Sequence, residues 1–190
     1  MADTFLPGRE SSLAYRVMLL QYRIMGGLGL GNPRKHVEHM PIEPGDTVID
    51  WGCGPGRVTI PLAMRVGAAG KVVAVDIEPL ALESVRKRAA SEGLGNIQTI
   101  LLESYAIPLE PNSVDLVVLL DTFHGVSDRP SLLSEIYRIL RADGYLFMDP
   151  GHMNRDAARG MVLDSRLFQL EQSWDRDMLF RRASAGRRHC

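Results

Sequence analysis

Apolar and polar positions follow a regular order along this chain from about Asp46 onward. Short apolar runs of strand length are separated by segments in which apolar residues recur at helical spacing. This alternation is typical of βαβ units built around a mostly parallel sheet. The strands predicted here are residues 47–51, 71–76, 97–102, 114–120 and 145–149. We therefore expect a doubly wound α/β domain.

Helical segments connect these strands and carry their own start and stop signals. One segment begins at Pro79, which suits the first turn of a helix, and Gly93 can close it. In the segment before residues 145–149, Asp128 can cap the helix and Gly144 can end it. Residues 57–65 and 154–163 are predicted as further helices.

The C-terminal part of the chain has a different pattern. Residues 167–173 and 178–183 are two β-like runs, separated by a polar turn around residues 175–177. Two such runs with a tight turn between them indicate an antiparallel hairpin. We therefore expect seven strands, of which the last adds an antiparallel strand to a mostly parallel sheet.

The N-terminal part contains one amphipathic stripe. Leu13, Val17, Leu20 and Ile24 lie on one face of a predicted helix. We expect residues 1–45 to form a helical cap on a catalytic domain of residues 46–190. The stripe is predicted to cover a substrate pocket, on its own subunit or exchanged in a homodimer; the alternative is a helix packed on the back of the sheet.

Composition narrows the class of protein. The chain has 190 residues, of which 45% are hydrophobic and 24% charged, as in one soluble globular domain. The apolar run at residues 114–120 is too short to span a membrane, and no secretory signal is recognised, so we expect a cytoplasmic protein. A net charge of −1 provides no general attraction for nucleic acid. Cys53 and Cys190 are expected to be free thiols.

One motif combines a carboxylate with a glycine-rich turn. Asp50 ends the first strand and is followed by Gly52, Gly54 and Gly56 at every second position. Glycines let a ligand approach the backbone closely and let the chain turn into a helix. Asp76 ends the second strand, where a carboxylate can accept hydrogen bonds from ribose hydroxyls. Strand, loop, helix, strand and acid in this order predict a nucleoside-binding site.

These segments resemble the class I S-adenosylmethionine-dependent methyltransferases, which have a Rossmann-like fold. The likeness is to small-molecule enzymes similar to the ubiquinone and menaquinone biosynthesis methyltransferases. It extends over residues 44–183 and includes the C-terminal hairpin, which resembles the antiparallel seventh strand of the family. The matching motifs are residues 50–56, 73–77, 103–109 with 113–115, and 133–144.

The resemblance implies roles for individual residues in binding S-adenosylmethionine. Asp50 and the backbone of Gly52, Cys53 and Gly54 would hold the amino-acid end, and Gly56 would belong to the same cofactor-binding loop. Asp50 has an alternative role as a helix cap.

The same resemblance assigns the rest of the cofactor. Asp76 would bind the ribose, with Ile77 and Ile107 beside the adenine. Glu103 stands where the family usually has Asp near the adenine amino group, and Ser104 is a substitute. Ile77 as a core residue and Glu103 as a solvated acid remain alternatives.

Candidate catalytic groups follow the fourth and fifth strands. Asp121 would face the methionine moiety, and His124 is the candidate general base because imidazole titrates near neutral pH. A solvated or substrate-packing His124 is equally compatible with the sequence, and His152 is a second candidate. His36 and His39 have a spacing compatible with a metal ion but no evident third ligand, so we expect surface residues and no metal site.

The function expected from this pattern is methyl transfer to a small molecule by in-line displacement. Residues 121–124 differ from the Asn/Asp-Pro-Pro-aromatic motif of amino-methylating enzymes, so no DNA substrate is expected. A silent cofactor-binding or assembly subunit and a methyltransferase acting on RNA or protein remain open. A nicotinamide-dependent oxidoreductase is disfavoured because it expects Gly-x-Gly-x-x-Gly, and here the third glycine comes one residue earlier.

Overall fold

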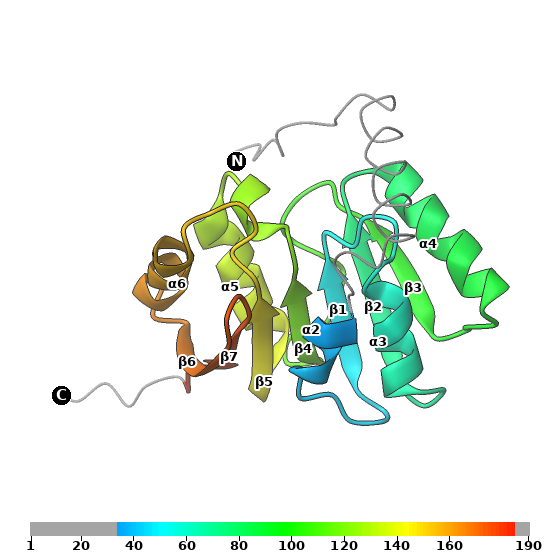
Figure 1. Cartoon of the computed structure of the whole chain (residues 1–190), viewed down its shortest axis with the longest axis horizontal. Helices are drawn as coiled ribbons and strands as arrows, with labels where there is room; N and C mark the ends of the chain where they lie inside the picture. The colour runs from blue at the N-terminus through cyan, green and yellow to red at the C-terminus, as the bar shows by residue number, and fades with distance from the viewer. Residues whose placement is uncertain (1–33, 185–190) are drawn as a thin grey trace.

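The computed structural model describes residues 34–184, which form one α/β domain around a seven-stranded sheet (Figure 1). The strand order is β3-β2-β1-β4-β5-β7-β6. Strands β1 to β5 are parallel to one another, whereas β7 is antiparallel to both of its neighbours, β5 and β6. The strands are β1 Thr47–Trp51, β2 Lys71–Asp76, β3 Ile97–Leu101, β4 Val114–Leu119, β5 Leu140–Met148, β6 Phe168–Ser173 and β7 Met178–Arg182. The predicted fold class and the C-terminal hairpin are confirmed.

Helices cover both faces of the sheet. They are α2 Arg34–Glu38, α3 Thr59–Val66, α4 Pro79–Ser91, α5 Arg129–Ile139 and α6 Arg155–Asp164, with a short 3-10 helix, η1, at Phe123–Gly125. Apolar residues of α5 and α6 share one buried cluster with Ile49 and Val117. Residues of α2 and α3 share another with Val48 and Val118. Alternate residues of β1 and β4 therefore face opposite layers, as expected for strands covered on both sides.

Two of the predicted helix starts are confirmed by their side-chain caps. The carboxylate of Asp128 accepts a hydrogen bond from the amide of Ser131 at 3.0 Å. At the start of α6, the side chain of Asn154 accepts one from the amide of Ala157 at 3.0 Å. Each cap satisfies a backbone donor that has no partner inside its helix.

The predicted end of α5 at Gly144 is wrong. The helix ends at Ile139, and Leu140 is already extended and paired with Val114 of β4. The pairing then jumps from Leu140 to Tyr145, so the residues between them bulge out of β5. A Cβ at Gly144 would lie 3.1 Å from the carbonyl oxygen of Asp115, which explains the need for glycine inside this strand.

The predicted helix with its Leu13 stripe, and the pocket cover expected from it, lie outside the described residues. Within residues 34–45, the side chains of Val37, Met40 and Ile42 are buried in the cluster that contains α3. This short stretch therefore packs against the same layer of the sheet as α3. Over residues 34–184, no helix has the length and apolar character needed to cross a membrane.

Candidate functional site

The carboxyl ends of the parallel strands place the candidate residues along one edge of the sheet. The chain leaves β1 for α3 on one face of the sheet and leaves β4 for α5 on the other (Figure 1). The neighbouring strands β1 and β4 thus form the point where the winding reverses. Ligands of open α/β sheets bind in the crevice outside the strands at such a point.

The three glycines after β1 adopt the left-handed conformation, but they have different surroundings. The φ angles of Gly52, Gly54 and Gly56 are 79°, 49° and 78°. A Cβ at Gly52 would lie 2.3 Å from Oγ1 of Thr122, and one at Gly56 would lie 3.0 Å from Cγ2 of Val85. Nothing lies within 4 Å of a Cβ built at Gly54. Two glycines thus allow close packing, whereas Gly54 borders open space.

Asp50 is buried beneath this loop. Its side chain accepts a hydrogen bond of 2.6 Å from the hydroxyl of Thr59, in the first turn of α3. Burial raises the pKa of the Asp50 carboxyl to about 6, and the hydrogen bond from Thr59 offsets part of this effect. Asp50 is therefore tied to α3 by a neutral partner.

Asp76 connects the end of β2 to the glycine loop. One carboxylate oxygen accepts a hydrogen bond from the amide of Gly54 at 2.8 Å, and the other accepts one from the amide of Glu78 at 2.9 Å. Burial raises the pKa of Asp76 in spite of these donors. Cys53, between the two acids, is a buried free thiol as expected, and burial raises its pKa well above the usual value. Cys190 lies outside the described residues.

The residues predicted to contact adenine are spread over the loops after β2 and β3. Ile77 is half-buried against the core, whereas Ile107 is buried and donates its amide to Glu135. Glu103 and Ser104 are exposed, and the hydroxyl of Ser104 bonds to the carbonyl of Ala106 at 3.2 Å. Their adenine contacts remain predictions.

The loops after β4 and β5 bring three of the predicted polar residues together. Oδ1 of Asp121 lies 3.7 Å from Nδ1 of His124 and 3.8 Å from Nε2 of His152. The two imidazole rings meet edge to face, with centroids 4.8 Å apart. His152, the second candidate from the sequence, therefore belongs to the same cluster as His124.

Two residues that sequence reasoning missed hold this cluster in place. Oδ1 of the buried Asp149 accepts hydrogen bonds from the amide of Asp121 at 2.7 Å and from that of Gly151 at 3.0 Å. A Cβ at Gly151 would lie 2.3 Å from Nδ1 of His124. The available signal was the acid and glycine that directly follow the apolar run of β5.

His36 and His39 lie at the surface as expected, each about one third exposed, but both rings contact one carboxylate that the sequence did not reveal. The Nδ1 atoms of the two rings each lie 2.8 Å from a different oxygen of Asp177, which is buried in the turn between β6 and β7. The ring of His39 also stacks on Trp174, with centroids 4.5 Å apart. These contacts fasten α2 to the hairpin. Sequence reasoning missed Asp177 because it lies far along the chain.

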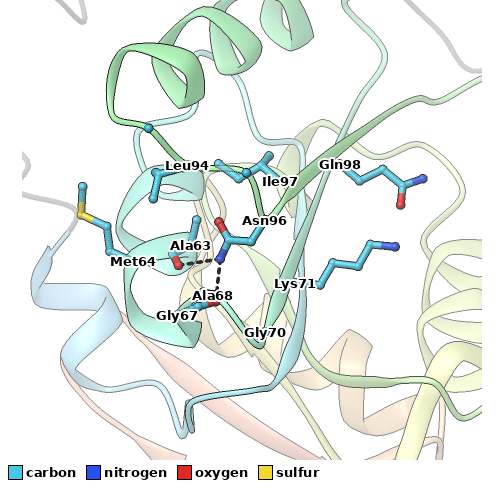
Figure 2. A pocket seen from close by; sticks show the side chains of 12 residues that line it. Ala63, Met64, Gly67, Ala68, Gly70, Lys71, Leu94, Asn96, Ile97 and Gln98 are labelled. Carbon is cyan, nitrogen blue, oxygen red and sulfur yellow. Dashed lines mark hydrogen bonds between the residues drawn. The ribbon is translucent and has the colours of Figure 1, made fainter.

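A hollow of about 570 Å³ lies at the amino ends of β2 and β3, beside Lys71 and Ile97. Figure 2 shows Asn96 turned towards α3, where its amide nitrogen donates to the carbonyl oxygens of Ala63 and Gly67, each at 2.9 Å. Lys71, which also lines the hollow, begins β2, whereas the glycine loop contacts the other end of that strand. This hollow is therefore separate from the candidate site.

The chain is similar to known methyltransferases. Residues 42–178 match the family model described as a methyltransferase domain. The chain is 34% identical over 116 residues to the ubiquinone/menaquinone biosynthesis C-methyltransferase of Hydrogenovibrio crunogenus, covering 60% of this chain and 46% of that protein. It is 29% identical over 146 residues to the arsenite methyltransferase of Halobacterium salinarum, covering 72% of this chain and 37% of that protein.

A solved structure has the same fold. A SAM-dependent methyltransferase from Aquifex aeolicus matches with a TM-score of 0.70 at 23% identity, covering 80% of this chain and 88% of that one. The chain spans less than half the length of either curated relative, 46% and 37% respectively.

Proposed function

The chain belongs to the methyltransferase domain family, and we propose that it transfers the methyl group of S-adenosylmethionine to a small-molecule acceptor. The observation that carries this proposal is the open space at Gly54, beside the two carboxylates of Asp50 and Asp76. A ligand can approach the backbone there without meeting a side chain. The two carboxylates supply negative charge and hydrogen-bond acceptors to the loop, where Asp76 binds the amide of Gly54 itself.

The chemistry of these residues fits the two polar ends of the cofactor. We propose that Asp50 and the backbone of Gly52, Cys53 and Gly54 bind the amino-acid end, because an ammonium group favours the charged form of a buried carboxylate. Asp76 already accepts two backbone amides, and its remaining lone pairs can accept the ribose hydroxyls. Gly56 packs the loop against α4 and keeps it in this position.

Weaker contacts complete the proposed cofactor site. Ile77 and Ile107 offer apolar surface for the adenine, and Glu103 and Ser104 offer exposed polar groups at the same edge. Asp121 would face the methionine moiety from the end of β4. The cofactor supplies an activated methyl group, so this chain has to align the acceptor and exclude water.

His124 is the residue that we propose contacts the acceptor. It lies in η1 after β4, and the Arg129 guanidinium donates to the carbonyls of Phe123 and His124 at 3.1 and 2.9 Å. These hydrogen bonds fix the backbone of η1. The imidazole is thus held beside the switch point of the sheet, where an acceptor must lie to meet the methyl group.

An oxygen-bearing acceptor such as a quinol is favoured over arsenite. The two curated relatives are named for quinone biosynthesis and for arsenite. Arsenite is thiophilic, whereas the described cysteine, Cys53, is buried with its pKa well above the usual value. A buried neutral thiol is a poor ligand for arsenic. We therefore propose an acceptor of the quinol type.

The test compares two glycines with the same backbone conformation. Gly54→Ala adds a methyl group to the proposed cofactor space, whereas Gly93→Ala adds one to open space at the end of α4, at a similarly positive φ. We expect Gly54→Ala to weaken binding of S-adenosylhomocysteine roughly 5- to 150-fold, as overpacking costs about 1–3 kcal/mol. Isothermal titration calorimetry measures this affinity.

The control separates lost binding from lost folding. Both variants carry the same left-handed strain, so similar melting temperatures and unchanged affinity in Gly93→Ala are expected. Equal affinity in the two variants would reject the placement of the cofactor. Turnover is then measured as release of S-adenosylhomocysteine, with a demethylated quinol and arsenite as acceptors. Turnover of neither, in a protein that binds the cofactor, would favour the silent-subunit alternative.

A further inference from the structure

Asp121, His124 and His152 form a cluster whose spacing suits a shared cation. Each offers one ligand atom, and these atoms all lie within 4.8 Å of one another. The distances of 3.7 and 3.8 Å from Oδ1 of Asp121 to the two imidazole nitrogens are too long for hydrogen bonds. Ligands bound to one zinc-sized ion at about 2.0–2.2 Å stand roughly 3–3.6 Å apart. Small side-chain movements would therefore bring all three onto one ion.

The imidazole of His124 gives independent support. Its Nδ1 is buried and has no hydrogen-bond partner among the residues that the structure describes. Buried polar atoms normally have a partner, so this atom is a candidate for a ligand bond. Glycine at position 151 leaves space for the ring, since a Cβ there would lie 2.3 Å from Nδ1. The chain thus makes room for this nitrogen next to Asp121.

Three side chains, those of Asp149, Arg129 and Arg176, form hydrogen bonds to the backbone around the cluster. Asp149 accepts the amides of Asp121 and Gly151, and Arg129 donates to the carbonyls of Phe123 and His124. Arg176 donates to the carbonyl of Gly151 at 2.8 Å. These contacts fix the backbone that carries the three ligands, whereas the side chains of Asp121 and His152 are largely exposed and can turn towards an ion.

We propose that Asp121, His124 and His152 bind a divalent transition-metal ion of the zinc or iron(II) class, and that this ion binds an oxygen of the methyl acceptor. Two imidazoles and one carboxylate suit such ions better than magnesium or calcium, which prefer oxygen ligands. Three protein ligands leave coordination positions open for a substrate. The role towards the acceptor rests on the proposed methyltransferase function, whereas the metal site itself does not.

The metal changes the role expected for His124, from general base to ligand. A hydroxyl that binds the ion loses its proton to water more readily, because the cation stabilises the oxyanion. The electron pair of this oxyanion, or of a carbon conjugated with it, then forms a bond to the methyl carbon. The bond from the methyl carbon to sulfur breaks, and sulfur keeps the electron pair. Where a ring carbon takes the methyl group, that carbon then loses its own proton to water, and the electron pair of the C–H bond returns to the ring and its oxygen. No side chain has to accept either proton.

The first test measures metal binding directly. Tag-free full-length protein, stripped with a chelator, is titrated with Co²⁺ by visible absorption and with Zn²⁺ by calorimetry. We expect one ion per chain. Asp121→Asn and His152→Ala should each weaken binding about 100-fold or more, and Gly151→Ala more than about tenfold because it displaces His124.

His36→Gln is the matched control. His36 has its Nδ1 2.8 Å from a carboxylate oxygen, but at Asp177, outside the cluster. Its substitution should leave metal affinity unchanged. Loss of binding in His36→Gln with retention in His152→Ala would overturn the proposal, as would an absence of binding in the parent protein.

The second test separates the metal site from the proposed function. Binding of S-adenosylhomocysteine is measured in His152→Ala, the variant that touches none of the proposed cofactor contacts, and should change less than about threefold. Metal binding without cofactor binding would reject the proposed methyltransferase function and support the metal site. Cofactor binding without metal binding would support the proposed function and reject the metal site.

The role of the ion towards the acceptor has its own test, in which catechol serves as an oxygen-donor probe and should shift the absorption bands of bound Co²⁺. Unshifted bands would reject the role towards the acceptor.

Discussion

Buried carboxylates occur at the glycine loop and at two contacts between structural elements, and their pKa values are shifted in opposite directions at these two kinds of site. At the glycine loop, burial raises the pKa of Asp50 to about 6 and also raises that of Asp76. The two other contacts are called structural joints below: Glu135 with Arg138, and Asp177 with His36 and His39. Burial again disfavours the charged carboxylate at each joint, but these hydrogen bonds outweigh the effect of burial, so the pKa values of Glu135 and Asp177 are lowered.

The difference lies in the charge of the hydrogen-bond donors. The groups that stabilise the carboxylates of Asp50 and Asp76 are a hydroxyl and backbone amides, which are neutral. The groups at the joints are a guanidinium and imidazoles. At a joint, a side chain of the protein carries the positive charge that balances the buried carboxylate, so no ligand is needed for this. The glycine loop instead keeps negative charge available for a ligand with an ammonium group and hydroxyls.

The largest expected effect comes from removing the cation of a joint. Arg138 binds both carboxylate oxygens of Glu135 at 2.7 Å and donates to the carbonyls of Leu109 and Ile107. Arg138→Met leaves the buried Glu135 charged without this partner. We expect a loss of roughly 2–3 kcal/mol in the free energy of unfolding at pH 7, below the value for a fully buried pair because Arg138 is partly exposed. Urea unfolding measures it.

A surface pair provides the control for this change. Lys87 and Glu83 form an ion pair on the exposed side of α4, with nitrogen and oxygen 2.6 Å apart. Lys87→Met should leave the free energy of unfolding almost unchanged, because the charges of an exposed pair are screened by water. Similar losses in Arg138→Met and Lys87→Met would show that the joint is an ordinary surface pair.

The next largest effect is expected for Asp50, whose substitution should raise the stability of the ligand-free protein and lower its affinity for the cofactor product. A raised pKa means that ionising Asp50 opposes folding, and this cost grows as the pH rises from about 4 through 6. Asp50→Asn removes the charge with little change of shape. We expect the ligand-free variant to gain on the order of 1 kcal/mol at pH 8, and to lose about 1–3 kcal/mol of affinity for S-adenosylhomocysteine.

These two signs distinguish a ligand-binding acid from a structural one. Urea unfolding at pH 5 and pH 8 and calorimetric titration provide the measurements, and Asp143→Asn, an exposed acid, is the control. If Asp50→Asn lowered stability and left affinity unchanged, Asp50 would belong with the structural joints.

Much of the fold was predictable because its signals are local. The strands are apolar runs, and the caps at Asp128 and Asn154 bond to residues three positions ahead. The glycine loop was recognised from its three glycines, which directly follow Asp50, and the structure gives all three positive φ angles. Local conformation and burial thus determine most of what the pattern predicted.

The errors have a common cause in long-range pairing. The end of α5 is decided by the pairing of Leu140 with Val114, which overrides the glycine signal at Gly144. Asp177 lies 141 positions from His36, so no local pattern connects them. His152 reaches His124 only because β4 and β5 are neighbours in the sheet. Contacts of this kind depend on the finished topology.

The smallest expected effect is the pH dependence of the joint between α2 and the hairpin. The hydrogen bond to Asp177 raises the pKa of His36 above its usual 6.5, although burial opposes this. The stabilisation is therefore fully present below pH 6.5 and is lost as the pH rises through the raised pKa of His36. In acid it is lost again as Asp177 takes up a proton, below the usual pKa of 3.8. The free energy of unfolding should fall by about 0.5–1 kcal/mol on each side of this pH range, called the alkaline limb and the acid limb.

His36→Gln separates the two limbs, because glutamine can still donate a hydrogen bond to Asp177 but does not titrate. We expect urea unfolding of this variant to lose the decline between pH 6 and 8 that the parent shows and to keep the acid limb. Asp177→Asn should remove both limbs. A decline above pH 6.5 that persists in His36→Gln would assign it to another group. The joint would then hold no cation of its own at neutral pH, and its contrast with the glycine loop would rest on Glu135 and Arg138.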